Sequence, residues 1–263
     1  MSSAVQNLTI ITGASTGIGR EMALQLAEKG HNLILTARSG DKLERLKALI
    51  QAQHSVQVYV YTADLSVAGA AAALYGTIRA DGHLPNYLVN NAGSGLYGDF
   101  ASSELEAVLA MMQLNMQSVV VLTRLFVADR LPLGSGTVMQ LASLLSFLPF
   151  PYYSVYSATK SFVLAFGETL AAELEGSGVG VVTLCPGPTD TPFNTADMLR
   201  TNAYSTNVPI SPAKVAQVGV ALLLRGKGKR LVGFQNWFIS NLPRITPDFL
   251  MMKIKKQLAS PKK

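Results

Sequence analysis

The sequence of 263 residues contains only one cysteine and three histidines. Cys185 has no second cysteine to pair with, so the chain cannot form an internal disulfide, which fits a reducing, cytoplasmic location. Because Cys185 stands between a predicted strand and a proline, we expect it to fill the core rather than act as a nucleophile. His31, His54 and His83 are scattered and lack the spacing of metal ligands, so no metal site is expected.

Long apolar runs and a basic leader are also missing. The first 15 residues contain no basic segment followed by a long apolar stretch, so no secretory signal is expected. No run approaches the roughly 18 apolar residues of a membrane-spanning helix. The composition, 49% hydrophobic and 14% charged, is typical of a compact globular protein.

Acidic residues are fewer than basic ones, and the net charge is +6 at neutral pH. The basic residues are spread along the chain, with a small excess in the final stretch KIKKQLASPKK. No basic helix with interleaved aromatic residues occurs, so nucleic acid is not an expected partner. An anionic cofactor or an acidic surface would account for part of the charge.

Apolar runs alternate with segments of helical periodicity over most of the chain. The runs are rich in β-branched residues, as in a parallel sheet that helices cover on both faces. The pattern predicts one doubly wound, Rossmann-type α/β domain over residues 1–263, with a parallel sheet of about seven strands. Helices are expected at residues 19–29 and 41–52. The strands that the pattern locates are residues 8–12, 33–36, 56–61, 87–89, 137–141 and 179–184.

A glycine-rich stretch, TGASTGIG, follows the first predicted strand and opens the first predicted helix. Its glycines leave room for the backbone to approach a pyrophosphate, and a helix N-terminus offers free N–H groups and a positive dipole. The strand before and the helix after favour a dinucleotide site over a simple tight turn. The residues expected to contact the cofactor here are Gly13, Ser15, Thr16, Gly17, Ile18 and Gly19.

The end of the second strand indicates which nicotinamide cofactor binds. An acidic residue there would bond the ribose 2′-hydroxyl of NAD, whereas an arginine accommodates the 2′-phosphate of NADP. The sequence has Ala37 in the place of the acid, followed by Arg38 and Ser39. A guanidinium can hold the phosphate in a fork of hydrogen bonds, so NADP(H) is predicted in preference to NAD(H).

These motifs, and others that follow in order, resemble the short-chain dehydrogenase/reductase family. After the glycine loop come ADL, VNNAG, YSATK and PGPTDT, and the resemblance covers residues 8 to about 191. It implies that Asp64 contacts the adenine, that VNNAG lies near the ribose, and that Thr191 lies near the nicotinamide carboxamide. The implied cofactor contacts beyond the glycine loop are Arg38, Ser39, Asp64, Leu65, Asn91, Ala92, Gly93, Tyr156, Lys160, Pro186, Gly187, Thr189 and Thr191.

The stretch YYSVYSATK contains three tyrosines and ends in a lysine. Helical spacing would place Tyr152, Tyr156 and Lys160 on one face. Taken alone, such spacing is more often part of a core or a solvated edge. The resemblance implies that Tyr156 is the catalytic tyrosine, because a lysine follows it by four residues and Ser143 precedes it by about a dozen.

Four residues form the catalytic set that the resemblance implies: Asn115, Ser143, Tyr156 and Lys160. The pKa of a phenol is near 10, and lowering it to near 7 requires about 4 kcal/mol. A unit charge about 4 Å away at an effective dielectric near 20 supplies about that much, so Lys160, aided by the positive charge of an oxidised nicotinamide, is expected to lower the pKa of Tyr156. Lys160 would also bond the nicotinamide ribose, Ser143 would polarise the substrate oxygen, and Asn115 would hold a water that links Lys160 to solvent.

The predicted reaction is hydride transfer between the nicotinamide and a carbonyl carbon, with Tyr156 as acid/base. Reduction is the expected direction, since cytosolic NADP pools are usually reduced. A sensor or scaffold that binds NADP(H) without turnover is the alternative. Such proteins usually lack a member of the catalytic set, and here all four are present.

The substrate is expected to be an apolar carbonyl or alcohol. SLLSFLPFPYY places Leu144, Leu145, Phe147, Leu148 and Phe150 beside the catalytic serine, although some of them could face the core instead. Residues 188–212, bounded by prolines and without clean periodicity, predict a lid of loop or short helices. The lid residues expected to complete the pocket are Phe193, Met198, Leu199 and Tyr204.

A C-terminal extension, residues 236–263, contains a predicted helix capped by Thr246 with Pro247 in its first turn. Its expected apolar face is Leu250, Met251, Ile254 and Leu258, with Lys253, Lys255 and Lys256 opposite. The helix could lie on an anionic membrane, but packing on the domain or on a second subunit is favoured. The resemblance also implies a homodimer or homotetramer, for which the apolar residues of 105–131 offer a surface.

Overall fold

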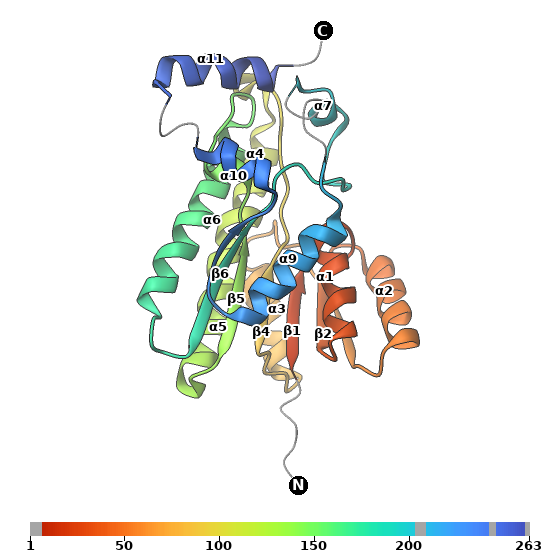
Figure 1. Ribbon diagram of the computed structural model, residues 1–263. Coiled ribbons are helices and arrows are strands. Elements are labelled where there is room, and N and C mark those ends of the chain that lie inside the picture. Colours follow the sequence, from red (N-terminus) through yellow and green to blue (C-terminus); the bar gives the residue numbers. More distant parts are fainter. Residues whose placement is uncertain (1–6, 203–208, 242–245, 261–263) are drawn as a thin grey trace.

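Seven parallel strands form one sheet at the centre of the structure, a computed structural model that describes residues 7–202, 209–241 and 246–260 (Figure 1). The strand order is β3-β2-β1-β4-β5-β6-β7, so the chain changes direction across the sheet between β1 and β4. In such sheets ligands bind at the carboxyl ends of the strands beside this point. The strands are β1 Leu8–Thr12, β2 Asn32–Ala37, β3 Val58–Thr62, β4 Tyr87–Asn90, β5 Gly136–Leu141, β6 Val179–Cys185 and β7 Gly228–Leu231.

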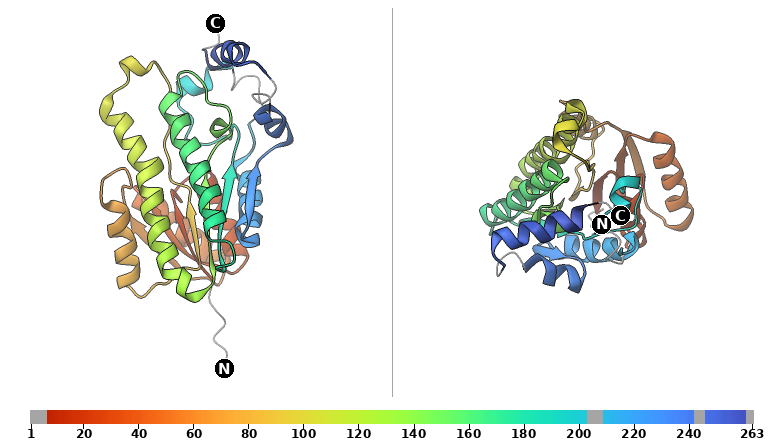
Figure 2. Two further views of the ribbon diagram at one scale, coloured as in Figure 1. Left: turned by 90° about the vertical axis from the view of Figure 1, so that its left-hand side faces the viewer. Right: turned by 90° about the horizontal axis from the view of Figure 1, so that it is seen from above.

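Helices cover both faces of the sheet (Figure 2). The helices α1, α2 and α9 share one apolar core with the sheet, and α3 and α5 share a second core on the opposite face. The helix α6 packs beside β5 and β6. The bounds are α1 Gly17–Glu28, α2 Gly40–Gln53, α3 Ala70–Ala80, α4 Leu105–Met112, α5 Ser118–Arg130, α6 Ser154–Glu173, α7 Ala196–Leu199, α9 Pro212–Arg225, α10 Phe234–Asn241 and α11 Asp248–Ala259.

The strand β1 shows why the strands read as unbroken apolar runs. Ile10 and Ile11 are both fully buried, but Ile11 packs with α1, α2 and α9 whereas Ile10 packs with α3 and α5. Successive side chains of a strand point to opposite faces, so a sheet covered on both sides requires apolar residues at every position. The predicted doubly wound fold is confirmed, and six strands match the prediction to within two residues.

The seventh strand, β7, was not located in the sequence because it does not have an apolar run. Its residues are GKRL, and Gly228, Lys229 and Arg230 are exposed. The strand pairs with β6 alone and forms the edge of the sheet. Polar residues are tolerated there, since an edge strand is only partly covered.

One helical stretch, Leu105–Leu133, is long and apolar enough to cross a membrane by length and hydropathy. We expected no apolar run near the length of a membrane-spanning helix. When hydropathy is averaged over 18 residues, this stretch does reach the level of such a helix, so the expectation is wrong for averaged hydropathy. The stretch joins α4, a π-helical turn and α5. Phe126 and Leu122 of α5 lie in the core beneath the sheet, so the apolar residues of α5 are those of a helix that packs in the domain.

The C-terminal helix α11 packs on the domain through only part of the predicted face, since Met251 is buried and Leu258 is half-buried. Met251 and Ala259 are buried and Lys255 is also buried, whereas Leu250 and Ile254 are exposed. Backbone carbonyls tether the helix: Tyr97 donates its hydroxyl to the carbonyl of Ala259 at 2.7 Å. The helix begins at Asp248, after Pro247. The hydrophobic pattern alone could not identify this face, because the helix is apolar on several sides.

Two glycines in the turn between α6 and β6 allow a matched test of backbone packing. Gly176 and Gly178 both have φ of +81°, but a Cβ on Gly178 would lie 1.9 Å from the carbonyl oxygen of Gly134, whereas one on Gly176 would meet nothing within 4 Å. Gly176→Ala should cost about 1–2 kcal/mol of unfolding free energy from backbone strain. Gly178→Ala should cost about 2 kcal/mol more, because the turns must separate. Urea unfolding measures both, and equal losses would contradict the close contact.

Candidate active site

A cavity of about 600 Å³ lies at the carboxyl ends of the strands, beside the point where the strand order reverses. Its walls come from the loops after β1, β2, β3, β4, β5 and β6, from α6, and from the two C-terminal helices. Every predicted cofactor or catalytic residue lines it except Gly19 and Asn115. The fold thus gathers residues that are up to 178 positions apart in the sequence, from Gly13 to Thr191.

The glycine loop after β1 forms one end of the cavity. Gly13 and Gly17 have φ of +65° and +57°, a region that favours glycine. Thr16 precedes α1 without a side-chain cap, and the first turn of α1 contains no acidic residue. Free N–H groups and the helix dipole therefore face the cavity, so this end fits the pyrophosphate of a dinucleotide.

Gly19 does not line the cavity, and its function is packing. A Cβ on Gly19 would lie 2.4 Å from Nδ2 of Asn91 and 2.5 Å from the carbonyl oxygen of Gly13. The Asn91 amide donates to the carbonyls of Thr12 at 2.8 Å and Gly13 at 3.1 Å. Only a residue without a side chain allows α1, the glycine loop and the loop after β4 to meet here.

The hydroxyl of Thr12 locks the loop after β4 to the end of β1. Its Oγ1 accepts from the backbone N–H groups of Asn91 at 3.0 Å and Ala92 at 2.9 Å. The same hydroxyl donates to the carbonyl of Val89 at 3.2 Å. Asn91, Ala92 and Gly93, which line the cavity, are held in place by the strand that carries the glycine loop.

Beyond the glycine loop, the cavity is bordered by Arg38, Ser39 and Lys42. The end of β2 carries no acidic residue, as predicted. Lys42 was missed in the sequence, although its position four residues after Arg38, in the first turn of α2, was a usable signal. Two cations at this end favour an anionic group over a plain hydroxyl.

Asp64 and Leu65 lie beside these cations on the cavity wall. Ser66 donates to Oδ1 of Asp64 through its hydroxyl at 2.6 Å and its N–H at 3.0 Å. Chiefly through the Ser66 hydroxyl, the pKa of Asp64 is held below its ordinary value. The carboxylate is therefore ionised and oriented, ready to accept a hydrogen bond from an adenine amine.

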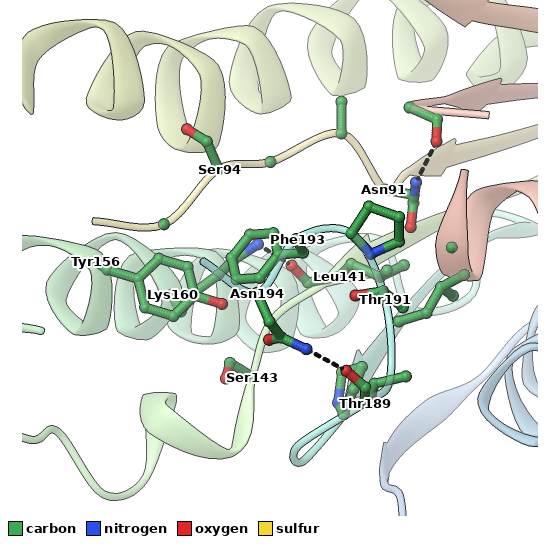
Figure 3. A pocket seen from close by; sticks show the side chains of 18 of the residues that line it. Asn91, Ser94, Leu141, Ser143, Tyr156, Lys160, Thr189, Thr191, Phe193 and Asn194 are labelled. Carbon is green, nitrogen blue, oxygen red and sulfur yellow. Dashed lines mark hydrogen bonds between the residues drawn. The ribbon is translucent and has the colours of Figure 1, made fainter. Parts of the chain in front are cut away.

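Tyr156, Lys160 and Ser143 come together at the middle of the cavity (Figure 3). Tyr156 and Lys160 lie one turn apart on α6, which begins at Ser154. The expected stacking of Tyr152 with them is wrong. Tyr152 precedes the helix and has φ of +64°, so its side chain does not share the helical face. This break in the backbone leaves Tyr156 as the tyrosine that pairs with the lysine in sequence register.

The electrostatics of this pair differ from the sequence expectation. Burial raises the pKa of Tyr156 to about 12, and a hydrogen bond with Ser143 opposes the rise. Burial lowers the pKa of Lys160 to about 8, and its Nζ donates to the carbonyl of Leu141 at 2.8 Å. Because burial has a larger effect than the hydrogen bond with Ser143, the phenol stays protonated at neutral pH in this geometry. The expected fall to near 7 included the charge of an oxidised nicotinamide, so for the cofactor complex it stays a prediction.

Asn115 sits behind the pair, in the π-helical turn Gln113–Gln117 between α4 and α5. Its Oδ1 accepts from the N–H of Ser94, and its Nδ2 donates to the Ser94 carbonyl and to Oγ1 of Thr159. The side chain is buried and braces the loop after β4 against α6. The predicted relay water on Asn115 stays a prediction.

The other half of the cavity is apolar. Of the predicted wall, Leu144, Leu145, Leu148 and Phe150 line it, whereas Phe147 packs with the core near α6. Of the predicted lid, Phe193 and Met198 line the cavity, Leu199 is exposed, and Tyr204 lies outside the described residues. Ile239 of α10 and Leu258 of α11 complete this half. The sequence did not place them there, since only packing brings the C-terminus to the cavity.

The loop after β6 forms the wall between the two halves. Thr189 accepts through its carbonyl from Nδ2 of Asn194 at 2.7 Å, which holds the loop in a turn that includes Thr191 (Figure 3). Gly187 lies so close to α10 that a Cβ would come within 2.1 Å of the Asn236 amide nitrogen. Pro186 and Gly187 line the cavity as predicted. The C-terminal helices therefore rest directly on this loop.

Cys185 ends β6 behind the cavity and does not reach it. The thiol is fully buried, and burial raises its pKa to about 12. A thiolate is the reactive form of cysteine. The expectation that Cys185 fills the core is confirmed.

Comparison with known proteins agrees with this geometry. The family model described as short chain dehydrogenase matches residues 7–201. A very-long-chain 3-oxoacyl-CoA reductase of Anas platyrhynchos is 30% identical over 255 residues, which are 95% of this chain and 80% of that protein.

Two solved structures are also similar. A short-chain dehydrogenase from Sphingobium yanoikuyae in complex with NADPH has 25% identity and a TM-score of 0.78 over 92% of this chain and 97% of its own. The bulky-bulky ketone specific alcohol dehydrogenase from Comamonas testosteroni has 25% identity and a TM-score of 0.77, over 90% and 92%. The family model covers most of the chain and both structures share its fold, so the chain belongs to the short-chain dehydrogenase family.

Proposed function

We propose that this protein uses NADPH to reduce the carbonyl group of a bulky apolar ketone, aldehyde or acyl substrate. The observation that carries the proposal is one cavity with two unlike halves. One half joins the glycine loop to Arg38 and Lys42, and the other is walled by leucine and phenylalanine. Tyr156 and Ser143 stand between the halves, where a carbonyl group would meet a nicotinamide.

The cofactor half supports NADP(H) over NAD(H). Arg38 and Lys42 border it, and no acidic residue ends β2. The carboxylate of Asp64 accepts a hydrogen bond from Ser66 rather than from either cation. A 2′-phosphate would pair with the guanidinium and the ammonium, which a 2′-hydroxyl cannot do. The similar structure from Sphingobium yanoikuyae holds NADPH, in line with this choice.

Bound NADPH would supply the hydride, and the protein would supply orientation and the proton. Tyr156 is protonated at neutral pH and lies where it can donate its proton to a carbonyl oxygen that gains charge, and the Lys160 ammonium would make it a stronger acid. Ser143, which hydrogen-bonds Tyr156, would hold the same oxygen.

Lys160 would act through its charge and its hydrogen bonds. With a pKa of about 8 it is largely protonated at neutral pH, although it is buried. A buried ammonium favours the phenolate that Tyr156 becomes once its proton has gone. The complete set of four side chains supports turnover over a binding-only sensor.

The apolar half of the cavity supports a hydrophobic substrate. Leu144, Leu148, Phe193, Met198 and Leu258 surround it, and a sugar would leave its hydroxyl groups unpaired there. The names of two similar proteins, a very-long-chain 3-oxoacyl-CoA reductase and a bulky-bulky ketone specific alcohol dehydrogenase, suggest the same class. The cytoplasmic location and the homo-oligomeric state stay predictions.

Removing one hydroxyl tests the acid. Tyr156→Phe should lower kcat for NADPH-dependent ketone reduction by about 100- to 10,000-fold, the usual contribution of a general acid. NADPH affinity should change little. Tyr152→Phe removes the same group four residues earlier, outside the cavity, and should retain activity. Consumption of NADPH is followed with a panel of apolar ketones and aldehydes, and equal rates in the two variants would refute the assignment.

Removing the two cations tests the cofactor choice. Arg38→Gln with Lys42→Gln should weaken NADPH binding by about 10- to 100-fold, since hydrogen bonds to charged groups are lost. NADH binding should stay the same. Lys47→Gln, on the same helix but outside the cavity, is the control. Fluorescence titration with each cofactor gives the affinities. An equal loss of affinity for NADH would show that the two cations do not recognise the 2′-phosphate.

The pH dependence of stability tests the burial of Lys160. Its folded pKa of about 8 lies below the ordinary lysine value of 10.5, so the unfolded chain binds more protons between these values and stability rises with pH there. Relative to Lys160→Met, the wild type should gain about 2 kcal/mol of unfolding free energy from pH 8 to pH 9.5. Denaturant unfolding of both proteins measures the difference. A constant difference over this range would mean that the lysine is not desolvated.

A further inference from the structure

The two C-terminal helices carry an exposed apolar surface, here called the C-terminal surface. It consists of six side chains with exposed fractions from 40% to 74%. Single exposed apolar residues are common, but a group on adjoining helices is a mark of an interaction site. The residues are Trp237 and Phe238 of α10, and Phe249, Leu250, Met252 and Ile254 of α11.

Both helices already bury another face in the domain. Asn236 of α10 is buried against Gly187, with its Nδ2 donating to the carbonyl of Val232 at 2.7 Å. Met251 and Ala259 of α11 are buried. The C-terminal surface is therefore the outward face of the two packed helices, and its apolar side chains are exposed.

Lysines accompany these residues, and the one acidic residue of α11 is Asp248, its first residue. Lys253 and Lys256 are exposed on α11, and residues 249–260 contain no acidic residue. In the sequence, residues 232–263 hold six lysines and arginines against one acid, Asp248, a net charge of +5 within a chain of net charge +6. Aromatic and aliphatic side chains beside outward lysines, without acids, are the composition of helices that lie on anionic bilayers.

The two helices that carry the C-terminal surface also cover the apolar half of the cavity. Ile239 and Leu258 line the cavity from the same two helices that carry the surface. Figures 1 and 2 show α10 and α11 together at the end of the molecule where the strands have their carboxyl ends, away from the N-terminus. A partner seated on this surface would lie next to the substrate half of the cavity.

We propose that the C-terminal surface docks on the anionic face of a lipid bilayer. Trp237, Phe238 and Phe249 would enter the interfacial layer, while Lys253 and Lys256 pair with lipid phosphates. A second copy of the chain fits less well, because a two-fold interface over this surface would bring lysines against lysines, with only one acidic residue on each α11 to offset them. Docking holds the substrate half of the cavity at the membrane, where apolar carbonyl compounds dissolve.

The chain contains its own reporter for this contact, because Trp237 is its only tryptophan. Vesicles of phosphatidylcholine with phosphatidylserine should shift the Trp237 emission to shorter wavelength, and brominated lipid should quench it. The protein should sediment with these vesicles, and less with phosphatidylcholine alone or at high salt. An unchanged emission spectrum together with no sedimentation would overturn the proposal.

Variants that retain Trp237 locate the contact. Lys253→Gln with Lys256→Gln should weaken vesicle binding by about 30-fold, at about fivefold for each lysine near the bilayer. Phe249→Ser with Met252→Ser should also weaken it. The matched controls are Lys29→Gln with Lys227→Gln and Leu131→Ser with Leu133→Ser, which change exposed residues elsewhere and should bind like the wild type.

As a folding control, NADPH affinity is measured for every variant and should be unchanged, so that lost vesicle binding does not reflect lost folding. Two further results would count against docking on a membrane. If the C-terminal variants bind vesicles like the wild type, the proposal is wrong. If they instead abolish a dimer seen by sedimentation velocity, the surface belongs to a second copy.

Discussion

The site depends on the close approach of three backbone segments around the side chain of Asn91. Its amide bonds the carbonyls of Thr12 and Gly13, and Gly19 gives it room by having no side chain. The hydroxyl of Thr12 then fixes the loop after β4 to the end of β1. Without this contact the glycine loop and the loop after β4 would move independently, and the cavity would lose one wall.

A second constraint is the burial of an acid and a base together. Tyr156 and Lys160 are both removed from water. Burial raises the pKa of Tyr156 and lowers that of Lys160, so the neutral form of each side chain is favoured. Burial thus keeps the phenol protonated and weakens the charge of the lysine, opposite to what a simple charge-pair argument gives. The polar groups that hold the pair in place, Leu141 through its carbonyl and Ser143 through its hydroxyl, come from the end of β5.

The C-terminal helices connect the cavity to the outside of the molecule. Their inner side chains, Ile239 and Leu258, complete the apolar half, and Tyr97 and Asn236 attach the helices to the domain. Their outer side chains are apolar and basic. The same two helices thus close the substrate half and present the surface proposed to meet a membrane.

The sequence by itself determined the doubly wound fold, the glycine loop, Arg38 after β2 and the Tyr156–Lys160 pair, because each is a local pattern of residue type and spacing. It did not determine β7, the backbone break at Tyr152, the face that α11 buries, or the contributions of Ile239 and Leu258. Only the tertiary structure decided these. They follow from contacts between segments far apart in the chain, and burial then shifted the pKa values of Tyr156 and Lys160, which spacing alone does not give.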